Sequence, residues 1–345
     1  MNSFKEFTIS DDEADQRLDR WLRRTCGYVT QSLVERMCRK GQIRLDGSRT
    51  KPSNRLSTGQ IVRIPSSLEG SGARHRPSSG RRKVTAPMLE SFRRSIIHCD
   101  DQFVAINKPA GLASQGGTGI HNSADVLARA FSERQGESWL LTHRLDRQTT
   151  GVLLFARSVP AARKIGRQFR LRQIEKTYWA VTQGVPQPPV GKIDSPVVHP
   201  GPATGPKGLS EKNRQTSEGE GLKRALTHYE VLDKAGSKSA LLAVYPHTGR
   251  THQIRVHLAN LGNAIVGDRK YRNASRKSSK APSVRFPCTN KLHLHSRSLS
   301  FAHPTLERRV RISAAPPDHF VQTCKFFGWE LENGDEQAAE FRFVS

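Results

Sequence analysis

The 345-residue sequence lacks a long apolar run, a paired-cysteine motif and enough acidic residues to balance its basic ones. Gly151 to Ala156 is among its longest apolar stretches and is far shorter than the roughly 18 residues of a membrane-spanning helix, so we expect no membrane span. The first 20 residues are acidic early and carry no apolar segment, which predicts neither a signal peptide nor a transit peptide. The 5 scattered cysteines form no CxxC pair, which predicts a reducing compartment without disulfides or a cysteine metal site.

The net charge is strongly positive, because 56 Lys and Arg residues stand against 31 Asp and Glu residues, a difference of +25. A compact chain with this charge repels itself unless a polyanion is bound, so nucleic acid is the first partner to expect. An anionic membrane is the alternative, but the sequence shows no amphipathic helix or lipidation motif that would anchor it there. The charge therefore favours a nucleic-acid-binding protein.

The first 66 residues have the pattern of a small basic domain. Two short amphipathic helices, one containing Trp21 and one capped by Thr30, precede strands over Gln42–Asp46 and Gln60–Ile64. Between residues 17 and 64 there are 12 Lys or Arg and 3 Asp or Glu, a local excess of +9. A solvated basic surface would explain this charge, but contact with RNA phosphates is favoured. The pattern, and above all IRLDGSRTKPSNRLSTGQIVRIP, resembles the alpha-L type RNA-binding domain, first named from a protein of the small ribosomal subunit.

Composition divides the rest of the chain. Residues 67–90 are rich in Gly, Ser, Pro and basic side chains and are predicted to be a flexible linker. Residues 91–345 read as one larger domain with polar insertions near 200–224 and 273–286. Within it, strand-like and helix-like segments mix without a regular βαβ rhythm. This indicates an α+β fold with a mixed, largely antiparallel sheet, preceded by the small N-terminal α/β domain.

Three segments of this larger domain carry polar residues where chemistry is plausible. In HRLDRQTTG, Asp146 lies between Arg144 and Arg147 in a loop that leads into a buried strand, a common place for a site. Taken alone, Asp146 most simply caps a turn and pairs with one of these arginines. In KTY, Tyr178 is either a core residue or a stacking surface for a base.

The third segment, TGRTHQIRVH, predicts a helix over His252–Leu261 whose buried stripe is Ile254, Leu258 and Leu261. Arg255 lies next to this stripe, so its guanidinium would be partly desolvated and would need an acidic partner. The histidines of this region have no metal-ligand spacing and are predicted to be structural or RNA-facing; they are His252, His257, His293 and His295.

Taken together and in this order, the three segments resemble the motifs of the large-subunit-type RNA pseudouridine synthases. NKPAGL over residues 107–112, VGD over 266–268 and LHSRSLSFAHP over 294–304 are further matches, and the resemblance covers nearly the whole chain. It implies isomerisation of uridine to pseudouridine within RNA, in which the N1–C1′ bond breaks, the uracil rotates and C5 joins C1′. It also implies no cofactor and no metal.

The resemblance also assigns roles to single residues. Asp146 would be the catalytic carboxylate, acting either as a nucleophile on C1′ or as the base that removes a sugar proton, and Arg255 would be its cationic partner. Tyr178 would stack on the uracil and help to remove the C5 proton, with Ile254 packed beneath the ring. Arg144 would enter the space that the extruded uridine leaves.

These expectations leave rival functions open. The resemblance favours large-subunit ribosomal RNA over transfer RNA, a bacterial-type cytoplasmic protein over an organellar one, and a monomer that binds no membrane. A non-catalytic RNA-binding ribosome-assembly factor on the same scaffold fits the charge and the small domain equally well. A metal-dependent hydrolase that uses the histidines is a weaker alternative.

Overall fold

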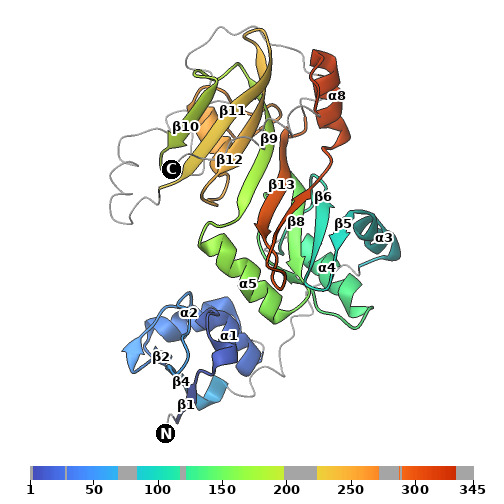
Figure 1. Cartoon of the computed structure of the whole chain (residues 1–345). Coiled ribbons are helices and arrows are strands. Elements are labelled where there is room, and N and C mark those ends of the chain that lie inside the picture. The colour runs from blue at the N-terminus through green and yellow to red at the C-terminus, as the bar shows by residue number, and fades with distance from the viewer. Residues whose placement is uncertain are drawn as a thin grey trace. The chain divides into compact units, whose positions relative to one another are not determined.

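The computed structural model describes residues 3–27, 29–68, 84–116, 122–197, 224–271, 287 and 290–331 (Figure 1). The chain divides into two compact units, Met1–Arg81 and Arg82–Ser345. The predicted insertions near 200–224 and 273–286 lie outside the described residues, apart from Arg224, and so do residues 69–83 of the predicted linker. Among the described helices, none has both the length and the apolarity needed to cross a membrane.

The N-terminal unit combines a small sheet with two helices. Its sheet has the strand order β1-β4-β2-β3 and is antiparallel throughout. The elements are β1 (Phe4–Thr8), η1 (Asp11–Glu13), α1 (Leu18–Thr25), α2 (Gln31–Arg39), β2 (Arg44–Leu45), β3 (Ser48–Arg49), β4 (Ile61–Pro65) and η2 (Ser66–Leu68).

The local signals in this unit act as predicted, except at its first strand. The side chain of Thr30 accepts a hydrogen bond from the Leu33 backbone N–H and caps α2. Trp21 is buried in the hydrophobic core of the N-terminal unit. The Phe7 ring lies edge-on to it at a centroid distance of 5.5 Å. Strand β1, which carries Phe7, was not predicted, because only one of its five side chains is even partly buried and it shows little apolar alternation.

The larger unit is built on one sheet of ten strands. Its strands are β5 (Ile96–Cys99), β6 (Phe103–Lys108), β7 (Leu140–Leu141), β8 (Thr150–Ala156), β9 (Glu175–Gln183), β10 (Val190–Asp194), β11 (Leu226–Ala235), β12 (Ser239–Pro246), β13 (Leu294–Ala302) and β14 (Arg309–Ser313). Their order is β10-β11-β12-β9-β13-β8-β6-β5, with β14 paired to β13 and β7 to β8. Of these pairings β13 with β8 is parallel and the others are antiparallel. The predicted α+β class with a mixed, largely antiparallel sheet is confirmed.

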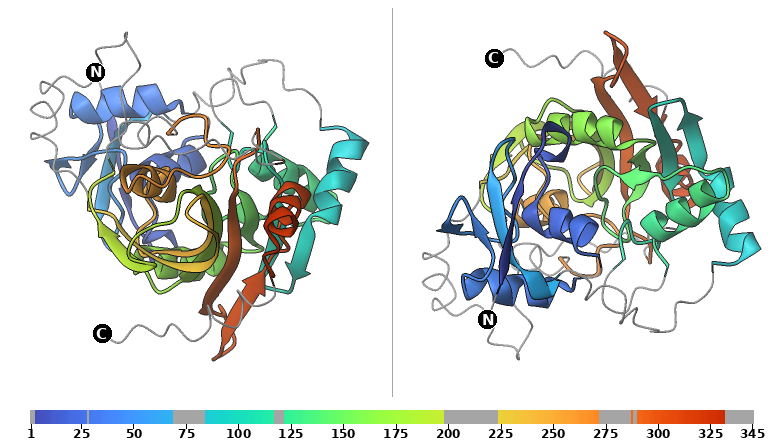
Figure 2. Two further views of the ribbon diagram at one scale, coloured as in Figure 1. Left: turned by 90° about the horizontal axis from the view of Figure 1, so that it is seen from above. Right: turned by 90° about the horizontal axis from the view of Figure 1, so that it is seen from below.

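In the described part of this unit, five helices cover the sheet (Figures 1 and 2). They are α3 (Ala86–Arg94), α4 (Ala124–Glu133), α5 (Val159–Arg170), α7 (Gln253–Asn260) and α8 (Asp318–Phe327). The alternation of side chains along β6 and β8 sends Val104 and Phe155 toward α3 and α4, and Phe103 and Leu154 toward α5. At the other half of the sheet, α7 packs on β9, β11 and β12, and α8 packs on the Trp179 side of β9.

Two details differ from the sequence prediction. Helix α3 begins at Ala86, inside the range 67–90 that was predicted to be linker, because Leu89 and Phe92 are buried. In α7, Ile254 and Leu258 are buried in the core as predicted, but Leu261 follows the last helical residue and is 37% exposed. The predicted stripe was therefore one residue too long.

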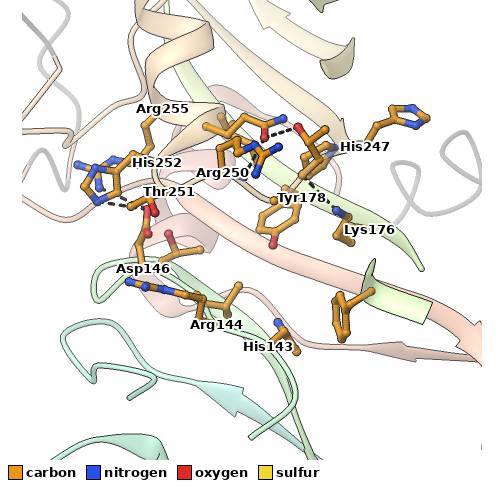
Figure 3. A pocket seen from close by; sticks show the side chains of 18 of the residues that line it. His143, Arg144, Asp146, Lys176, Tyr178, His247, Arg250, Thr251, His252 and Arg255 are labelled. Carbon is orange, nitrogen blue, oxygen red and sulfur yellow. Dashed lines mark hydrogen bonds and ion pairs between the residues drawn. The ribbon is translucent and has the colours of Figure 1, made fainter. Parts of the chain in front are cut away.

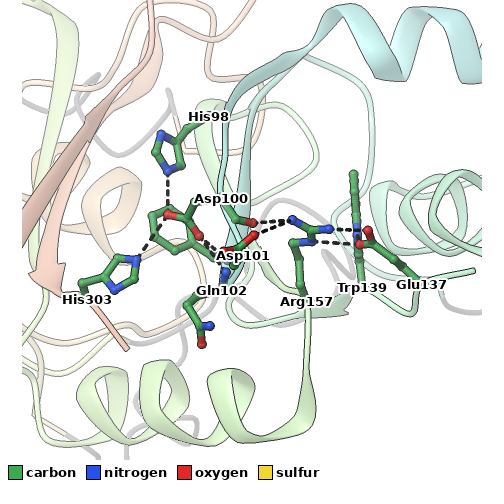
Figure 4. Close-up of polar contacts among 9 residues, drawn as sticks. His98, Asp100, Asp101, Gln102, Glu137, Trp139, Arg157 and His303 are labelled. Atoms are coloured by element: carbon green, nitrogen blue, oxygen red, sulfur yellow. Dashed lines mark hydrogen bonds and ion pairs between the residues drawn. The ribbon is translucent and has the colours of Figure 1, made fainter. Parts of the chain in front are cut away.

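A polar network fastens the β5–β6 turn to two other segments (Figure 4). One carboxylate oxygen of Asp100 accepts hydrogen bonds from His98 at 2.8 Å and from His303 at 3.3 Å. Arg157, directly after β8, donates to the Asp100 carbonyl and holds Glu137 with two hydrogen bonds. The network explains these histidines as structural residues.

Gly151 makes the closest backbone approach in the sheet. It has φ +107° at the start of β8, where β8 runs parallel to β13 and pairs with Ser296. A Cβ atom at Gly151 would lie 2.1 Å from the Ser296 carbonyl oxygen, which is backbone and cannot swing away. The parallel pairing of these strands therefore requires glycine here.

Replacing Gly151 by Ala is expected to lower the free energy of unfolding by at least about 3 kcal/mol, since the new methyl group overlaps backbone. The matched control is Gly136→Ala, where φ is +72° but no atom lies within 4 Å of the added Cβ. In that control only the strain of the left-handed backbone lowers the free energy of unfolding, by about 1 kcal/mol. Urea unfolding of both variants checks this, and equal losses would contradict the close approach.

Candidate active site

A cavity of about 450 Å³ opens among the loop before β8, the start of β9 and the loop that leads into α7. All five predicted site residues line it: Arg144, Asp146, Tyr178, Ile254 and Arg255. They come from three segments that are far apart in the sequence. Figure 3 shows Asp146, Arg255 and His252 at one side of the pocket, Tyr178 in its middle, and Lys176 and His247 at the other side.

The loop that carries Asp146 is held on both sides of the carboxylate. On one side, the Ser114 hydroxyl accepts a hydrogen bond from the Leu145 N–H at 2.9 Å and donates to the Leu145 carbonyl at 2.8 Å. On the other side, the Arg147 Nε donates to the Gly111 carbonyl, and the Gly111 N–H donates to the Arg147 carbonyl, both at 2.8 Å. Arg147 is therefore used to fix the loop and is not the partner of Asp146.

Lys108 adds a buried clamp beneath this loop. Its side chain is fully buried, and its Nζ donates to the carbonyls of Pro109, Leu112 and Arg147 at 2.9, 2.9 and 3.3 Å. Burial lowers the pKa of Lys108 to about 7, and the nearby Asp146 charge acts in the opposite direction. The NKPAGL motif thus has a physical role that its sequence alone did not reveal: it ties two loops together under the carboxylate.

Arg255 joins two carboxylates. Its Nε and Nη2 donate to both oxygens of Asp268 at 2.7 and 2.9 Å, and its Nη1 lies 3.5 Å from Asp146 Oδ2. The predicted need of Arg255 for an acid is met mainly by Asp268, which is 1% exposed and also accepts the N–H groups of Lys270 and Tyr271. The guanidinium is therefore fixed by Asp268 and presented to Asp146.

The protonation of this pair follows from burial and charge. Burial alone would raise the pKa of Asp268, but the hydrogen bonds and charge of Arg255 outweigh it and hold that pKa below its usual value. Burial likewise disfavours the charged form of Arg255, and Asp268 outweighs this and raises the pKa of Arg255. Both groups are therefore charged at neutral pH.

His252 also lies in the pocket, although it was predicted only to be a structural or RNA-facing histidine. Its Nε2 lies 3.7 Å from Asp146 Oδ2, and its Nδ1 forms a 2.7 Å hydrogen bond with the Tyr271 hydroxyl. It has φ +56° directly before α7, a left-handed conformation that turns its ring toward the pocket. The sequence offers one signal for this position of His252: it directly precedes the first turn of α7, and that turn carries Arg255.

Gln253 explains why the sequence TGRTHQ folds into this loop. Its buried side-chain oxygen accepts hydrogen bonds from the Thr248 hydroxyl at 2.6 Å and the Arg250 N–H at 3.1 Å. Its Nε2 donates to the Leu226 carbonyl and the Thr227 hydroxyl. The loop is thereby closed on itself and fastened to β11.

Tyr178 and Ile254 form the apolar part of the pocket. Ile254 is 6% exposed and lies in the same apolar cluster as the half-buried Tyr178. Burial raises the pKa of Tyr178 to about 12, and the Asp146 charge acts in the same direction, so the phenol is protonated at neutral pH. Arg144 is exposed, lines the same pocket and forms no ion pair with Asp146 in the part of the chain that the structure describes.

The other three histidines of the sequence prediction are buried and have both ring nitrogens hydrogen-bonded. His257 bonds to Thr227 and Ser195, His293 to Lys291 and Thr323, and His295 to Thr150 and Ala314. Among the described residues, no group of three or more His, Cys, Asp or Glu side chains is arranged to hold a metal ion.

Two family models match parts of the chain. A family model described as RNA pseudouridylate synthase matches residues 102–260, and one described as S4 domain matches residues 16–62. The chain is 34% identical over 325 residues to the ribosomal large subunit pseudouridine synthase C of Escherichia coli, covering 93% of this chain and 96% of that protein. The chain belongs to the RNA pseudouridylate synthase family.

Two further comparisons support the same family. The ribosomal large subunit pseudouridine synthase C of Haemophilus ducreyi is 32% identical over 317 residues, which cover 92% of this chain and 93% of that protein. The solved structure of human RNA pseudouridylate synthase domain containing 4 superposes with a TM-score of 0.58 at 30% identity, covering 71% of this chain and 97% of that one. The protein is thus a pseudouridine synthase, an isomerase that acts on RNA, with an S4 domain at its N-terminal end.

Replacing Asp268 by Asn in this synthase is expected to release Arg255 from its fixed position. Because the pKa of Asp268 is lowered in the folded state, its contribution to stability is present above the unfolded pKa near 4 and is lost as the pH falls through the folded pKa. The variant should therefore be less stable at pH 7 by about 2 kcal/mol or more. It should also lose less stability than the parent between about pH 5 and pH 3.

Unfolding by urea at several pH values measures this difference. Identical pH dependence in parent and variant would contradict the assignment of the charged pair.

Proposed function

We propose that this synthase isomerises specific uridines in large-subunit ribosomal RNA, with Asp146 as the catalytic carboxylate. The observation that carries the proposal is the meeting of Asp146, Arg255 and Tyr178 in one open pocket from three distant segments. The choice of large-subunit ribosomal RNA rests on the names of relatives that match over nine-tenths of the chain. A substrate of this kind also supports the predicted cytoplasmic location.

Asp146 is suited to act on the sugar of the target nucleotide. Its side chain is 17% exposed, so it is accessible from the pocket, while its loop is clamped on both sides. Positive character develops at C1′ as the N1–C1′ bond breaks, and a carboxylate beside it stabilises that charge. The same position serves attack on C1′ or removal of a sugar proton. In either case Arg255 keeps the carboxylate oriented.

The remaining pocket residues are proposed to contact the uracil and to fill the gap that the extruded uridine leaves. Tyr178 offers its ring to the uracil, and Ile254 packs beneath it. Because its phenol is protonated at neutral pH, Tyr178 can help to remove the C5 proton only by giving up its own proton as it takes the new one. Arg144 is exposed at the pocket and carries no fixed partner in the described chain, so it is free to fill the gap that an extruded uridine leaves.

Replacing Asp146 by Asn tests the site directly. Pseudouridine formation should fall by more than about a thousandfold, because the side chain loses its negative charge and its nucleophilicity. RNA affinity should change by less than about threefold. The measurement is a pseudouridine map of ribosomal RNA from cells that lack the gene and carry either the parent or the variant.

The control is Asp101→Asn, since that side chain is fully exposed and lies outside the pocket. It should restore every site that the parent restores. If the Asp146 variant still modifies RNA, the catalytic assignment is wrong. If the parent restores no modified uridine in large-subunit ribosomal RNA, the substrate assignment is wrong.

The N-terminal unit is proposed to supply phosphate contacts. It has its own hydrophobic core, so a chain without residues 1–81 keeps the core clusters of the larger unit intact. Removal should weaken RNA binding and lower the slope of log affinity against log salt concentration by about 0.7 for each contact with single-stranded RNA that is lost. A titration of RNA affinity between low and moderate salt measures this slope. An unchanged slope would remove the RNA-binding role from the unit.

A further inference from the structure

The lining of the pocket carries an excess of positive charge, and Lys176 lies at the side away from Asp146 (Figure 3). Six Lys or Arg residues line the cavity, and Asp146 is its only carboxylate among the described residues. Arg255 is neutralised by Asp146 and Asp268. For Arg144, Arg172, Lys176 and Arg250, the described lining holds no further carboxylate.

Backbone geometry positions two of these cations, Lys176 and Arg172. Lys176 stands two residues before Tyr178 on β9, so both side chains leave the strand on the same face. Its Nζ donates to the Thr248 carbonyl at 3.2 Å and forms no ion pair in the described part of the chain. Arg172 directly follows the C-cap of α5 with φ +58°, and its left-handed conformation closes that helix: its N–H donates to the Phe169 carbonyl and the Gln173 N–H donates to the Gln168 carbonyl.

The charges crowd one another. Burial and, to a smaller extent, the charge of Arg172 lower the pKa of Lys176 to about 8. His247, which lines the same side, has its pKa lowered by burial and then by His228, Lys176 and Arg172. Cations that repel one another at a partly buried position are stabilised when an anion joins them. Because these side chains line the cavity, an anion has space to bind beside them.

We propose that Lys176 and Arg172 bind one phosphodiester group of the RNA substrate, next to the target nucleotide. The inference rests on the proposed function, because it takes the uracil to lie on Tyr178. Lys176 and Tyr178 are about 7 Å apart along the strand, so a phosphate at Lys176 is within one nucleotide of a base on Tyr178. A lysine acts on phosphate as a point charge and an arginine as a two-pronged donor, which together hold a tetrahedral anion. The pocket would then fix the target nucleotide at its phosphate as well as at its base.

The first measurement is the salt dependence of affinity for fragments of large-subunit ribosomal RNA, which requires no turnover. Lys176→Met should lower the slope of log affinity against log salt concentration by about 0.7, the value for one lost contact with single-stranded RNA. Lys176→Arg should restore it, since the charge returns. The matched control is Arg167→Ala, an exposed residue of α5 outside the pocket, which removes one charge without changing the contact.

The second measurement locates the phosphate. The probe is an oligoribonucleotide around a uridine that the map identifies, with single uncharged methylphosphonates placed in turn along it, bound to the Asp146→Asn chain. One position near the target should weaken binding by about tenfold or more. At that position alone, adding Lys176→Met or Arg172→Ala should cause no further loss, because the partner is already absent.

The outcomes separate this site from the proposed function. Unchanged salt slopes for Lys176→Met, or equal additional losses at every methylphosphonate position, would overturn the phosphate site while leaving the synthase activity standing. Competition by inorganic phosphate without any methylphosphonate effect would also overturn it, since the anion bound would then be free phosphate. Failure of the parent to form pseudouridine would refute the proposed function, and the salt slopes would still decide whether Lys176 contacts RNA.

Discussion

The pocket depends on one buried ion pair, that of Arg255 with Asp268. The guanidinium is stable in this position because it donates to both oxygens of Asp268, and that carboxylate in turn accepts two backbone N–H groups. Once fixed, Arg255 presents its remaining nitrogen to Asp146 at 3.5 Å. Asp146 thus receives a positive neighbour whose place is set by another part of the fold. Without Asp268, the guanidinium of Arg255 would rotate toward Asp146 or toward water and would no longer orient the Asp146 carboxylate.

A second constraint lies under the carboxylate, where hydrogen bonds join two loops. Lys108, Gly111 and Ser114 hold the two residues that flank Asp146, and these bonds come from the loop after β6. Preorganisation of this kind matters because a reacting group that is already oriented loses little entropy in the transition state. Tyr178 and the proposed phosphate site extend the same logic to the substrate, which would be held at base, sugar and backbone by three faces of one cavity.

Much of this was predictable, and the exceptions have physical causes. The elements around Asp146, Tyr178 and Arg255 follow from alternation and helical periodicity, and the α+β class follows from their order. That Arg255 would need an acid was predictable from its place beside a buried stripe. The identity of that acid was not, because Asp268 is joined to Arg255 by tertiary packing alone. For the same reason Arg147, the nearest cation in the sequence, bonds to Gly111 instead of Asp146.

The sequence by itself determined the basic partner surface, the two-part organisation and the residue types needed for the chemistry, since charge, turn signals and motif order are local properties of the chain. Only the tertiary structure decided which residues meet: it brought His252 to Asp146, placed Lys108 beneath the loop and collected Arg172 and Lys176 at the far side of the pocket. The reason is that contacts across a ten-stranded sheet are set by strand order and register, which local patterns do not encode.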